Sequence, residues 1–318
     1  MALLACLSGC GPGTAPPPDN PLSGLTLWVD PRSAAAQAEQ RLRQDGAATD
    51  ADTVQVISAQ PVATWLVVDD PAATTGRVVR KAELLDQLPV LVLYHRPGRD
   101  CGSYSAGGAA EQDGYLDWVR AVSDAIGERS ALVVVEPDAI AQAVSGQCAI
   151  EGRPDATYAL LSAVVDILAD NPNTCTYLDA GHPGWVADID ALAAALRSSG
   201  VARASGFSLN VSNFASTADN QAYGDRLSAV LDDAQYVVDV SRNGRGAPDA
   251  EPGSVDAWCN PIGAALGEDP RLGPQRARAV GFLWIKEPGA SDGSCRPGEP
   301  PAGQFWVESA LRLVRQRP

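Results

Sequence analysis

Four aspartates follow apolar segments of the 318-residue sequence, at Asp100, Asp138, Asp179 and Asp292. Where carboxyl groups crowd together, burial and mutual repulsion raise the pKa of one while the others stay ionised. The protonated carboxyl can donate to a leaving oxygen, and an ionised one can activate water, which is the chemistry of glycosidic-bond hydrolysis. A single Asp after a strand is more often a helix cap or turn former, so the signal lies in their joint placement.

Aromatic and hydrogen-bonding side chains lie in the same segments as these aspartates. Tryptophan faces stack on sugar rings, while Asn, Asp, Lys and Arg bond the ring hydroxyls. Lone tryptophans are more often core residues, and we expect Trp28 and Trp118 to be core. His95 and His182 lie here too, but two histidines alone do not make a metal site. A metal-dependent hydrolase using His182 stays open as a minor alternative, and no cofactor is expected.

Apolar runs alternate with amphipathic segments along the chain, which fits one α/β domain. The runs are apolar on both faces, as buried parallel strands are, and no GxGxxG or P-loop string follows them, which disfavours a doubly wound sheet. We therefore predict a single-domain, distorted TIM-like barrel of about seven to eight parallel strands, whose ends gather the polar segments at one rim. The expected strands cover residues 25–29, 54–58 with 62–66, 90–94, 131–135, 176–178, 206–209, 236–240 and 280–285, and the expected helices 34–44, 114–126, 156–168, 189–197, 221–231 and 305–314.

The charge balance bears on the partners of the protein. The chain has 39 acidic and 24 basic residues, a net charge of −15. Such a surface repels phosphate backbones, so nucleic-acid binding is not expected. A neutral substrate suits this charge, and we expect a monomer.

The N-terminal residues resemble an export signal. Residues 7–10, Leu-Ser-Gly-Cys, resemble a bacterial lipobox, in which Cys10 is lipidated after cleavage. Residues 1–10 are too short to span a bilayer and lack the basic residues of a signal, which a start codon further upstream would explain. Residues 11–24 are predicted to be a disordered tether to a barrel over 25–318. We expect an exported protein, extracellular or lipid-anchored at the bacterial cell surface.

Five cysteines remain once Cys6 and Cys10 are set aside. No CxxC pair occurs, which disfavours a zinc site, and export favours disulfides. Bonds between Cys101 and Cys148 and between Cys259 and Cys295 would each close a loop beside a polar segment. Cys175 begins an apolar strand, and we expect it to be a buried free thiol.

Several long strings of the sequence resemble glycoside hydrolase family 6. They are collinear, cover about residues 25–318, and lie at 94–101, 104–108, 136–139, 177–185, 209–214, 241–244, 258–261 and 283–293. The family consists of cellulases, endoglucanases and cellobiohydrolases that cut β-1,4-glucan with inversion on a distorted barrel. Its two disulfides match the pairing expected above.

The resemblance implies a role for each matching residue. Asp138 would be the general acid, Asp100 would keep it protonated, and Asp292 would stand at the place of the debated catalytic base, at roughly 6.5–9.5 Å or more from the acid. Tyr94 would press on the distorted sugar at the cleavage site. The substrate contacts implied or expected are Trp65, Trp185 and Trp258 as stacking platforms, with Arg99, Ser105, Asp179, His182, Asn210 and Lys286 as polar contacts.

Three departures from the family pattern affect rate and specificity more than reaction type. Ala290 stands where relatives carry Glu, Ala106 stands where some use Ser, with Ser105 the expected substitute, and His95 replaces Asn, Asp or Gly. The short stretches 101–148 and 258–284 leave little material for a tunnel, so we expect an endoglucanase with an open cleft. The alternatives are a cellobiohydrolase and, because of Ala290, a catalytically weakened glucan-binding protein.

Overall fold

The computed structural model describes residues 17–251 and 254–318, and the predicted lipobox with Cys10 lies outside them. One curled sheet of eight strands runs through the molecule in the order β1-β2-β3-β4-β5-β6-β8-β7. All neighbouring pairs are parallel except β7 with β8. The predicted single-domain, distorted α/β barrel is confirmed. The strands are β1 Thr64–Leu66, β2 Val90–Leu93, β3 Ala131–Val135, β4 Thr174–Asp179, β5 Gly206–Leu209, β6 Gln235–Asp239, β7 Arg271–Leu272 and β8 Ala279–Leu283.

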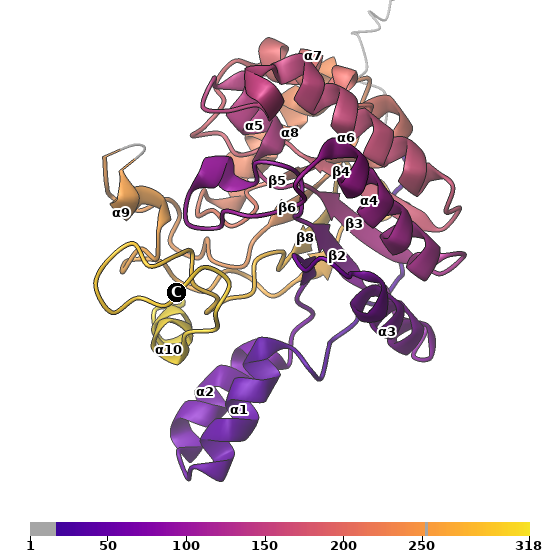
Figure 1. Ribbon diagram of the computed structural model, residues 1–318. Helices are drawn as coiled ribbons and strands as arrows, with labels where there is room; N and C mark the ends of the chain where they lie inside the picture. The colour runs from indigo at the N-terminus through magenta and orange to yellow at the C-terminus, as the bar shows by residue number, and fades with distance from the viewer. Residues whose placement is uncertain (1–16, 252–253) are drawn as a thin grey trace, which may run out of the picture.

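Ten α-helices are found in the described part of the chain, and most of them cover the outer face of the sheet (Figure 1). Neighbouring helices α3 and α4, α4 and α6, α6 and α7, and α7 and α8 pack together around it. Helices α1 and α2 form a hairpin apart from this ring, with α10 beside α2. No helix of the described ranges is both long and apolar enough to cross a membrane. The helices are α1 Ala34–Gln44, α2 Ala48–Ser58, α3 Ala72–Glu83, α4 Gln112–Ile126, α5 Ala139–Val144, α6 Pro154–Ala169, α7 Ile189–Ser198, α8 Thr217–Val230, α9 Val255–Trp258 and α10 Val307–Arg315.

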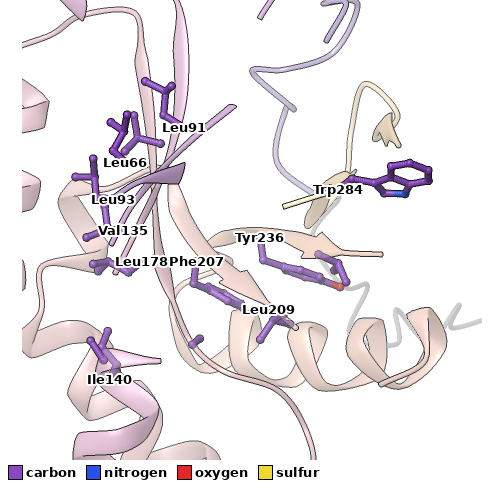
Figure 2. Close-up of a cluster of buried hydrophobic side chains, with 14 of the residues drawn as sticks. Leu66, Leu91, Leu93, Val135, Ile140, Leu178, Phe207, Leu209, Tyr236 and Trp284 are labelled. Atoms are coloured by element: carbon purple, nitrogen blue, oxygen red, sulfur yellow. The ribbon is translucent and has the colours of Figure 1, made fainter. Parts of the chain in front are cut away.

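Alternate residues of each strand pack on opposite faces of the sheet, as the period of two requires. Leu91, Leu93 and Val135 belong to the cluster between sheet and helices, which Figure 2 shows together with Leu178 and Phe207. A second cluster fills the inside of the curled sheet and contains Val92, Leu132, Val134, Tyr177, Val237 and Val280. Burial on both faces explains why the strand sequences are continuously apolar.

The sheet does not close into a regular barrel. At the seam between its first and last parallel strands, residue 62 forms one isolated parallel bridge with Trp284. The amide of Ala63 donates to the Trp284 carbonyl at 3.0 Å. Beyond this bridge β1 and β8 are not paired, so no continuous ladder of backbone hydrogen bonds closes the barrel at this seam.

Three expectations about local structure are wrong. Residues 54–58 belong to helix α2, where Ala51, Val54, Ile57 and Ser58 are buried at helical spacing. The tether ends earlier than residue 24, because Leu22 is fully buried and the buried Asn20 donates to the carbonyls of Gly273, Pro274 and Val280. Residues 25–29 contribute only one bridge, between Leu27 and Leu88.

Candidate active site

The carboxyl ends of the strands bring the predicted polar segments to one rim. Tyr94 follows β2, Asp138 follows β3, and Lys286 follows β8. Asp138 is the N-cap of α5 with φ 74°, a left-handed conformation that few non-glycine residues adopt. Its backbone N–H donates to Oδ2 of Asp179 at 2.9 Å. The turn that displays Asp138 is therefore held by a second carboxylate directly beneath it.

Asp138 has the electrostatic setting of an acid that keeps its proton at neutral pH. Its side chain is half-buried, and within the described residues its carboxyl group accepts or donates no hydrogen bond. Burial, followed by the negative charges of Asp179 and Asp100, raises the pKa of Asp138 to about 8, against the opposing charges of Arg96 and Lys286. A carboxyl that is protonated and free of partners is available to a leaving oxygen.

Asp100 lies on a braced loop facing Asp138. Its Oδ2 accepts the amide of Ser105 at 2.7 Å, and burial raises the pKa of Asp100 against this hydrogen bond. The backbone of the loop is left-handed at Asp100 and Cys101, with φ 56° and 51°. The predicted disulfide between Cys101 and Cys148 is present, with a Cα–Cα distance of 5.9 Å. These contacts hold the Asp100 carboxylate in place over the rim.

Asp292 is a buried carboxylate bound to two cations. Its Oδ2 lies 2.9 Å from Nη1 of Arg242 and accepts the amide of Asn260 at 3.0 Å, while Nζ of Lys286 lies 3.5 Å from its Oδ1. Burial opposes ionisation of Asp292, but Arg242 and Lys286 outweigh it and lower the pKa of the carboxyl. The ionised form of Asp292 is therefore favoured over that of a free aspartate.

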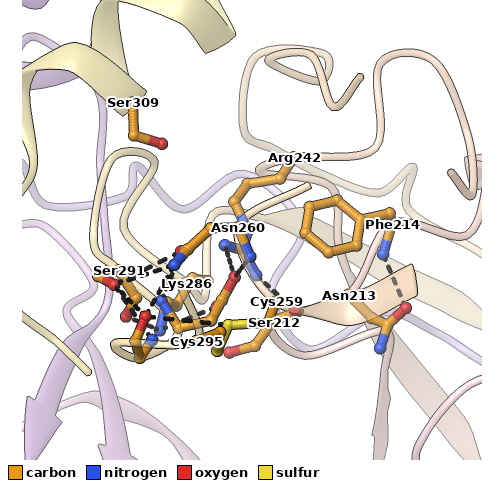
Figure 3. Close-up of polar contacts among 12 residues, drawn as sticks. Ser212, Asn213, Phe214, Arg242, Cys259, Asn260, Lys286, Ser291, Cys295 and Ser309 are labelled. Carbon is orange, nitrogen blue, oxygen red and sulfur yellow. Dashed lines mark hydrogen bonds and ion pairs between the residues drawn. A yellow bond between two sulfur atoms is a disulfide. The ribbon is translucent and has the colours of Figure 1, made fainter. Parts of the chain in front are cut away.

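The surroundings of Asp292 are fixed by packing and by the second disulfide. Figure 3 shows the guanidinium of Arg242 beside the ring of Phe214, 4.5 Å from its centroid. The predicted disulfide between Cys259 and Cys295 is present and lies next to Asn260 in the same view. The sequence reading gave no role to Arg242, although it lies in the polar segment after β6.

Aromatic side chains line the same rim. Trp65 of β1 meets Tyr94 edge to face at 5.2 Å, and Nζ of Lys286 lies 5.7 Å from the Trp65 ring. The Trp65 indole N–H donates to the carbonyl of Ile285 at 2.8 Å, which links β1 to the segment after β8. These contacts join the predicted platform, the phenol and the lysine into one group.

His182 and Trp185 form a second aromatic group, beside α5. Their ring centroids are 5.8 Å apart, and a methyl group at Gly181 would lie 3.0 Å from Cβ of Ala141. Burial lowers the pKa of His182 to about 4, so its imidazole is neutral. Nδ1 accepts the amide of Gly184 at 3.3 Å, which leaves the proton on Nε2 as a donor.

The loop that carries Asp100 contacts the segment that carries Asp292. Tyr104 lies 5.8 Å from Trp258, ring centroid to ring centroid. A methyl group at Gly293 would come within 2.6 Å of Cβ of Tyr104, so the two backbones approach closely. Trp258, predicted as a platform, thus lies where these two loops meet.

Three residues predicted as substrate contacts use their side chains for hydrogen bonds within the protein. Asp179 is 1% exposed, and its two oxygens accept from the amides of Asp138 and Gly181 and from the hydroxyl of Ser208. Asn210 is completely buried, and its amide bonds the backbone of Ala215 and of the strand beside it. Polar side chains that stabilise left-handed turns after strands carry the same sequence signal as sugar-binding ones.

Arg99 is the third of these residues. Its guanidinium donates to the carbonyls of Tyr94, Ser105 and Ala106 and lies 5.2 Å from the Tyr94 ring. It therefore braces the Asp100 loop through three backbone carbonyls. Ser105 contributes its backbone amide and carbonyl to the same loop.

Metal binding finds no support near His182. In the part of the chain that the structure describes, one group offers three candidate ligand atoms, Cys259, Cys295 and Glu299, and both sulfurs are in the disulfide. His95 stacks on Trp118 at 4.8 Å instead, and Trp118 is core as expected. Cys175 is half-buried and unbridged, so it is less buried than expected.

The comparisons with known proteins agree with this geometry. The chain is 37% identical to Endoglucanase 1 of Streptomyces halstedii over 98% of its own length and 95% of the relative. It is also 37% identical to Endoglucanase A of Cellulomonas fimi over 93% of its length, but it spans only 62% of that relative. The solved endoglucanase Cel6 of Mycobacterium tuberculosis, in complex with methyl-cellobiosyl-4-deoxy-4-thio-β-D-cellobioside, superposes with a TM-score of 0.84 at 39% identity, covering 93% of this chain and 99% of that one. The family model described as Glycosyl hydrolases family 6 matches residues 22–317. This chain therefore belongs to glycosyl hydrolase family 6.

Proposed function

We propose that this protein is a cellulase that hydrolyses internal β-1,4-glucosidic bonds of cellulose or a related β-glucan with inversion. The observation that carries the proposal is the setting of Asp138. Its carboxyl keeps a proton at neutral pH, with the pKa raised by burial and by Asp179 and Asp100 to about 8, and it makes no hydrogen bond to the described residues. A glycosidase requires such an acid for its leaving group.

In the proposed reaction, Asp138 donates its proton to the glycosidic oxygen as the bond to the anomeric carbon breaks. Water attacks the opposite face of the sugar and passes its proton to a second water molecule, which gives the inverted product. Asp100 and Asp292 supply negative charge near the oxocarbenium-like transition state. A base role for Asp292 gains no support from its contacts, because its pKa is lowered by Arg242 and Lys286 and Oδ2 already accepts two hydrogen bonds.

The aromatic groups support a chain-like substrate. Three aromatic groups, Trp65 with Tyr94, Trp185 with His182, and Trp258 with Tyr104, come from segments that also carry the predicted polar residues. Planar aromatic rings stack on sugar rings, and several such groups suit a substrate of several sugars. Relatives named as endoglucanases support internal cutting.

Cellobiohydrolase action is the second candidate. The contact of Tyr104 with Gly293 and Trp258 favours it, since loops that meet across a rim enclose the substrate. A relative of Aspergillus niger at 27% identity is named as a probable 1,4-β-D-glucan cellobiohydrolase. Viscosity separates the two modes, because internal cuts shorten a soluble polymer faster than cuts at its end.

The test is NMR of the products of cellohexaose, combined with the viscosity of carboxymethyl cellulose at equal release of reducing ends. We expect α-anomeric products and a steep early fall in viscosity. Asp138→Ala should lose hydrolysis and still bind oligosaccharide, whereas Asp124→Asn, an exposed aspartate of α4, should behave as wild type. Equal inertness of wild type and Asp138→Ala would favour a glucan-binding protein, and β-products would exclude inversion.

We also propose that the protein is exported and that Cys10 carries a lipid. The two disulfides support export, because they persist in oxidising compartments. Labelling with a fatty-acid analogue should mark wild type and not Cys10→Ser. Recovery of both proteins as unlabelled, released enzyme would exclude the anchor.

A further inference from the structure

Arg96 is a buried cation at the centre of the site that the mechanism above does not use. It follows Tyr94 and His95 at the end of β2 and is 2% exposed. Its Nη1 donates to the carbonyls of Pro97 and Gly98, and its Nη2 donates to Oε1 of Gln142 at 2.6 Å. All of these acceptors are uncharged.

The charge of Arg96 is therefore not neutralised by a direct partner. Within residues 17–251 and 254–318 the guanidinium forms no ion pair, and its Nε is buried without an acceptor. Burying a cation in this way is costly unless nearby charges compensate it. The compensating charges are carboxyls at longer range, because Arg96 acts on Asp100, Glu136 and Asp138.

Gln142 connects this cation to the helix of the acid. Gln142 lies on α5 and is 5% exposed, and its backbone N–H donates to the backbone carbonyl of Asp138 at 2.8 Å. Asp138 is the N-cap of the same helix. Arg96 is thus fixed relative to Asp138 through one side chain, and it is fixed to the Asp100 loop through Pro97 and Gly98.

We propose that Arg96 is a positioning residue of the hydrolysis reaction: its buried charge, held against helix α5 by Gln142, sets the pH above which Asp138 ceases to donate its proton. The inference rests on the proposed role of Asp138 as general acid. Without this cation, Asp138 would keep its proton to higher pH, and the ionised form of Asp100 would be less favoured.

The other groups around Asp138 define what Arg96 alone contributes. Negative charge comes from Asp179 of β4 and from Asp100, and positive charge comes from Lys286 after β8 as well as from Arg96. Glu136, two residues before the acid, is 1% exposed and accepts from the His95 amide and the Tyr115 hydroxyl. Lys286 forms an ion pair with Asp292 and also lowers the pKa of Asp138, whereas Arg96 lowers the pKa of Asp138 without such an ion pair.

The experiment is the pH profile of kcat/KM for soluble glucan in three variants. Arg96→Met removes the charge, Gln142→Glu neutralises it with a near-isosteric partner, and Arg96→Lys retains it. The first two should move the alkaline limb upward by about one pH unit, the effect of one charge at side-chain distance in an effective dielectric of about 20. At one pH unit above the apparent pKa of the wild-type alkaline limb, kcat/KM relative to its maximum should then be about fivefold higher in these variants than in wild type. Arg96→Lys should keep the wild-type limb.

The possible outcomes separate this inference from the proposed function. An inactive wild type, or activity that survives Asp138→Ala, would overturn the proposed function. An active wild type whose alkaline limb is unmoved in Gln142→Glu would overturn the role of Arg96 alone. Gln142→Glu also covers the case in which Arg96→Met fails to fold, since it preserves the side-chain volume.

Discussion

Asp179, whose carboxylate accepts the backbone N–H of Asp138, offers a direct test of how Asp138 keeps its proton. After burial, the charge of Asp179 is the largest cause of the pKa of about 8 at Asp138. Asp179→Asn removes that charge and keeps an oxygen for the amides of Asp138 and Gly181. We expect the pKa of Asp138 to fall by about one to two units, since a neighbouring charge shifts the pKa of a carboxyl by about one to three units.

The size of the effect on activity follows from the protonated fraction of Asp138. With a pKa of about 8, about nine tenths of the molecules carry the proton at pH 7. A fall of one unit leaves about half, and a fall of two units leaves about a tenth. Burial raises the pKa of Asp179 itself to about 7, so its charge is fully developed only above that pH. The variant should therefore resemble wild type at pH 5 and lose about two- to tenfold in kcat/KM at pH 7.

The assay is kcat/KM on soluble glucan between pH 4 and pH 9, with Ser208→Ala as the matched control. Ser208 donates to the other oxygen of Asp179 at 3.1 Å, so the control loses a hydrogen bond there and retains the charge. An alkaline limb in Asp179→Asn that coincides with wild type would refute the electrostatic reasoning. A loss of activity equal at all pH values would show that Asp179 acts only by shaping the turn.

Three further predictions concern stability. The pKa of Asp138 is raised to about 8 in the folded protein, so from about pH 4 to pH 8 the unfolded chain loses a proton that the folded protein keeps, and folding is progressively destabilised. The Tm of Asp138→Asn should therefore exceed that of wild type by an increasing amount across this pH range, and parallel Tm curves would contradict this. Arg242→Met should lower the free energy of unfolding in urea by about 3–5 kcal/mol by leaving Asp292 buried without its main cation; an unchanged urea midpoint would contradict the burial argument. Replacing Cys259 and Cys295 together by Ser should cost about 2–4 kcal/mol, and an unchanged urea midpoint would show that the loop is ordered without the bond.

The strands and their carboxyl-end residues were predictable because burial on both faces gives continuous apolar runs. The strand predicted at residues 131–135 matches β3, and that at 206–209 matches β5. Residues 54–58 were misassigned because Val54, Val56 and Ile57 have high strand propensity, whereas the burial of Ala51, Val54 and Ile57 follows a helix. The antiparallel strand β7 has two residues, too few to show a period.

The site was predictable in its location but not in the direction of each side chain. Asp138 and Asn210 follow strands and Asp179 ends one, and all three segments were expected at the rim. The structure turns Asp179 and Asn210 into the protein because their oxygens bind turn amides. Arg242 and Arg96 were overlooked because a buried arginine is recognised by its acceptors, which lie 50 and 46 residues away at Asp292 and Gln142.

The seam of the barrel has a consequence for how the protein responds to its ligand. Between β1 and the segment ending β8, the Ala63 amide and the Trp65 indole each donate to one carbonyl on the other side. A sugar stacked on Trp65 of β1 would also lie near Lys286, which follows β8, and could contact both sides of the seam. Binding of a glucan should therefore slow hydrogen exchange at the Ala63 amide. The substrate would then stabilise the seam between β1 and the segment after β8.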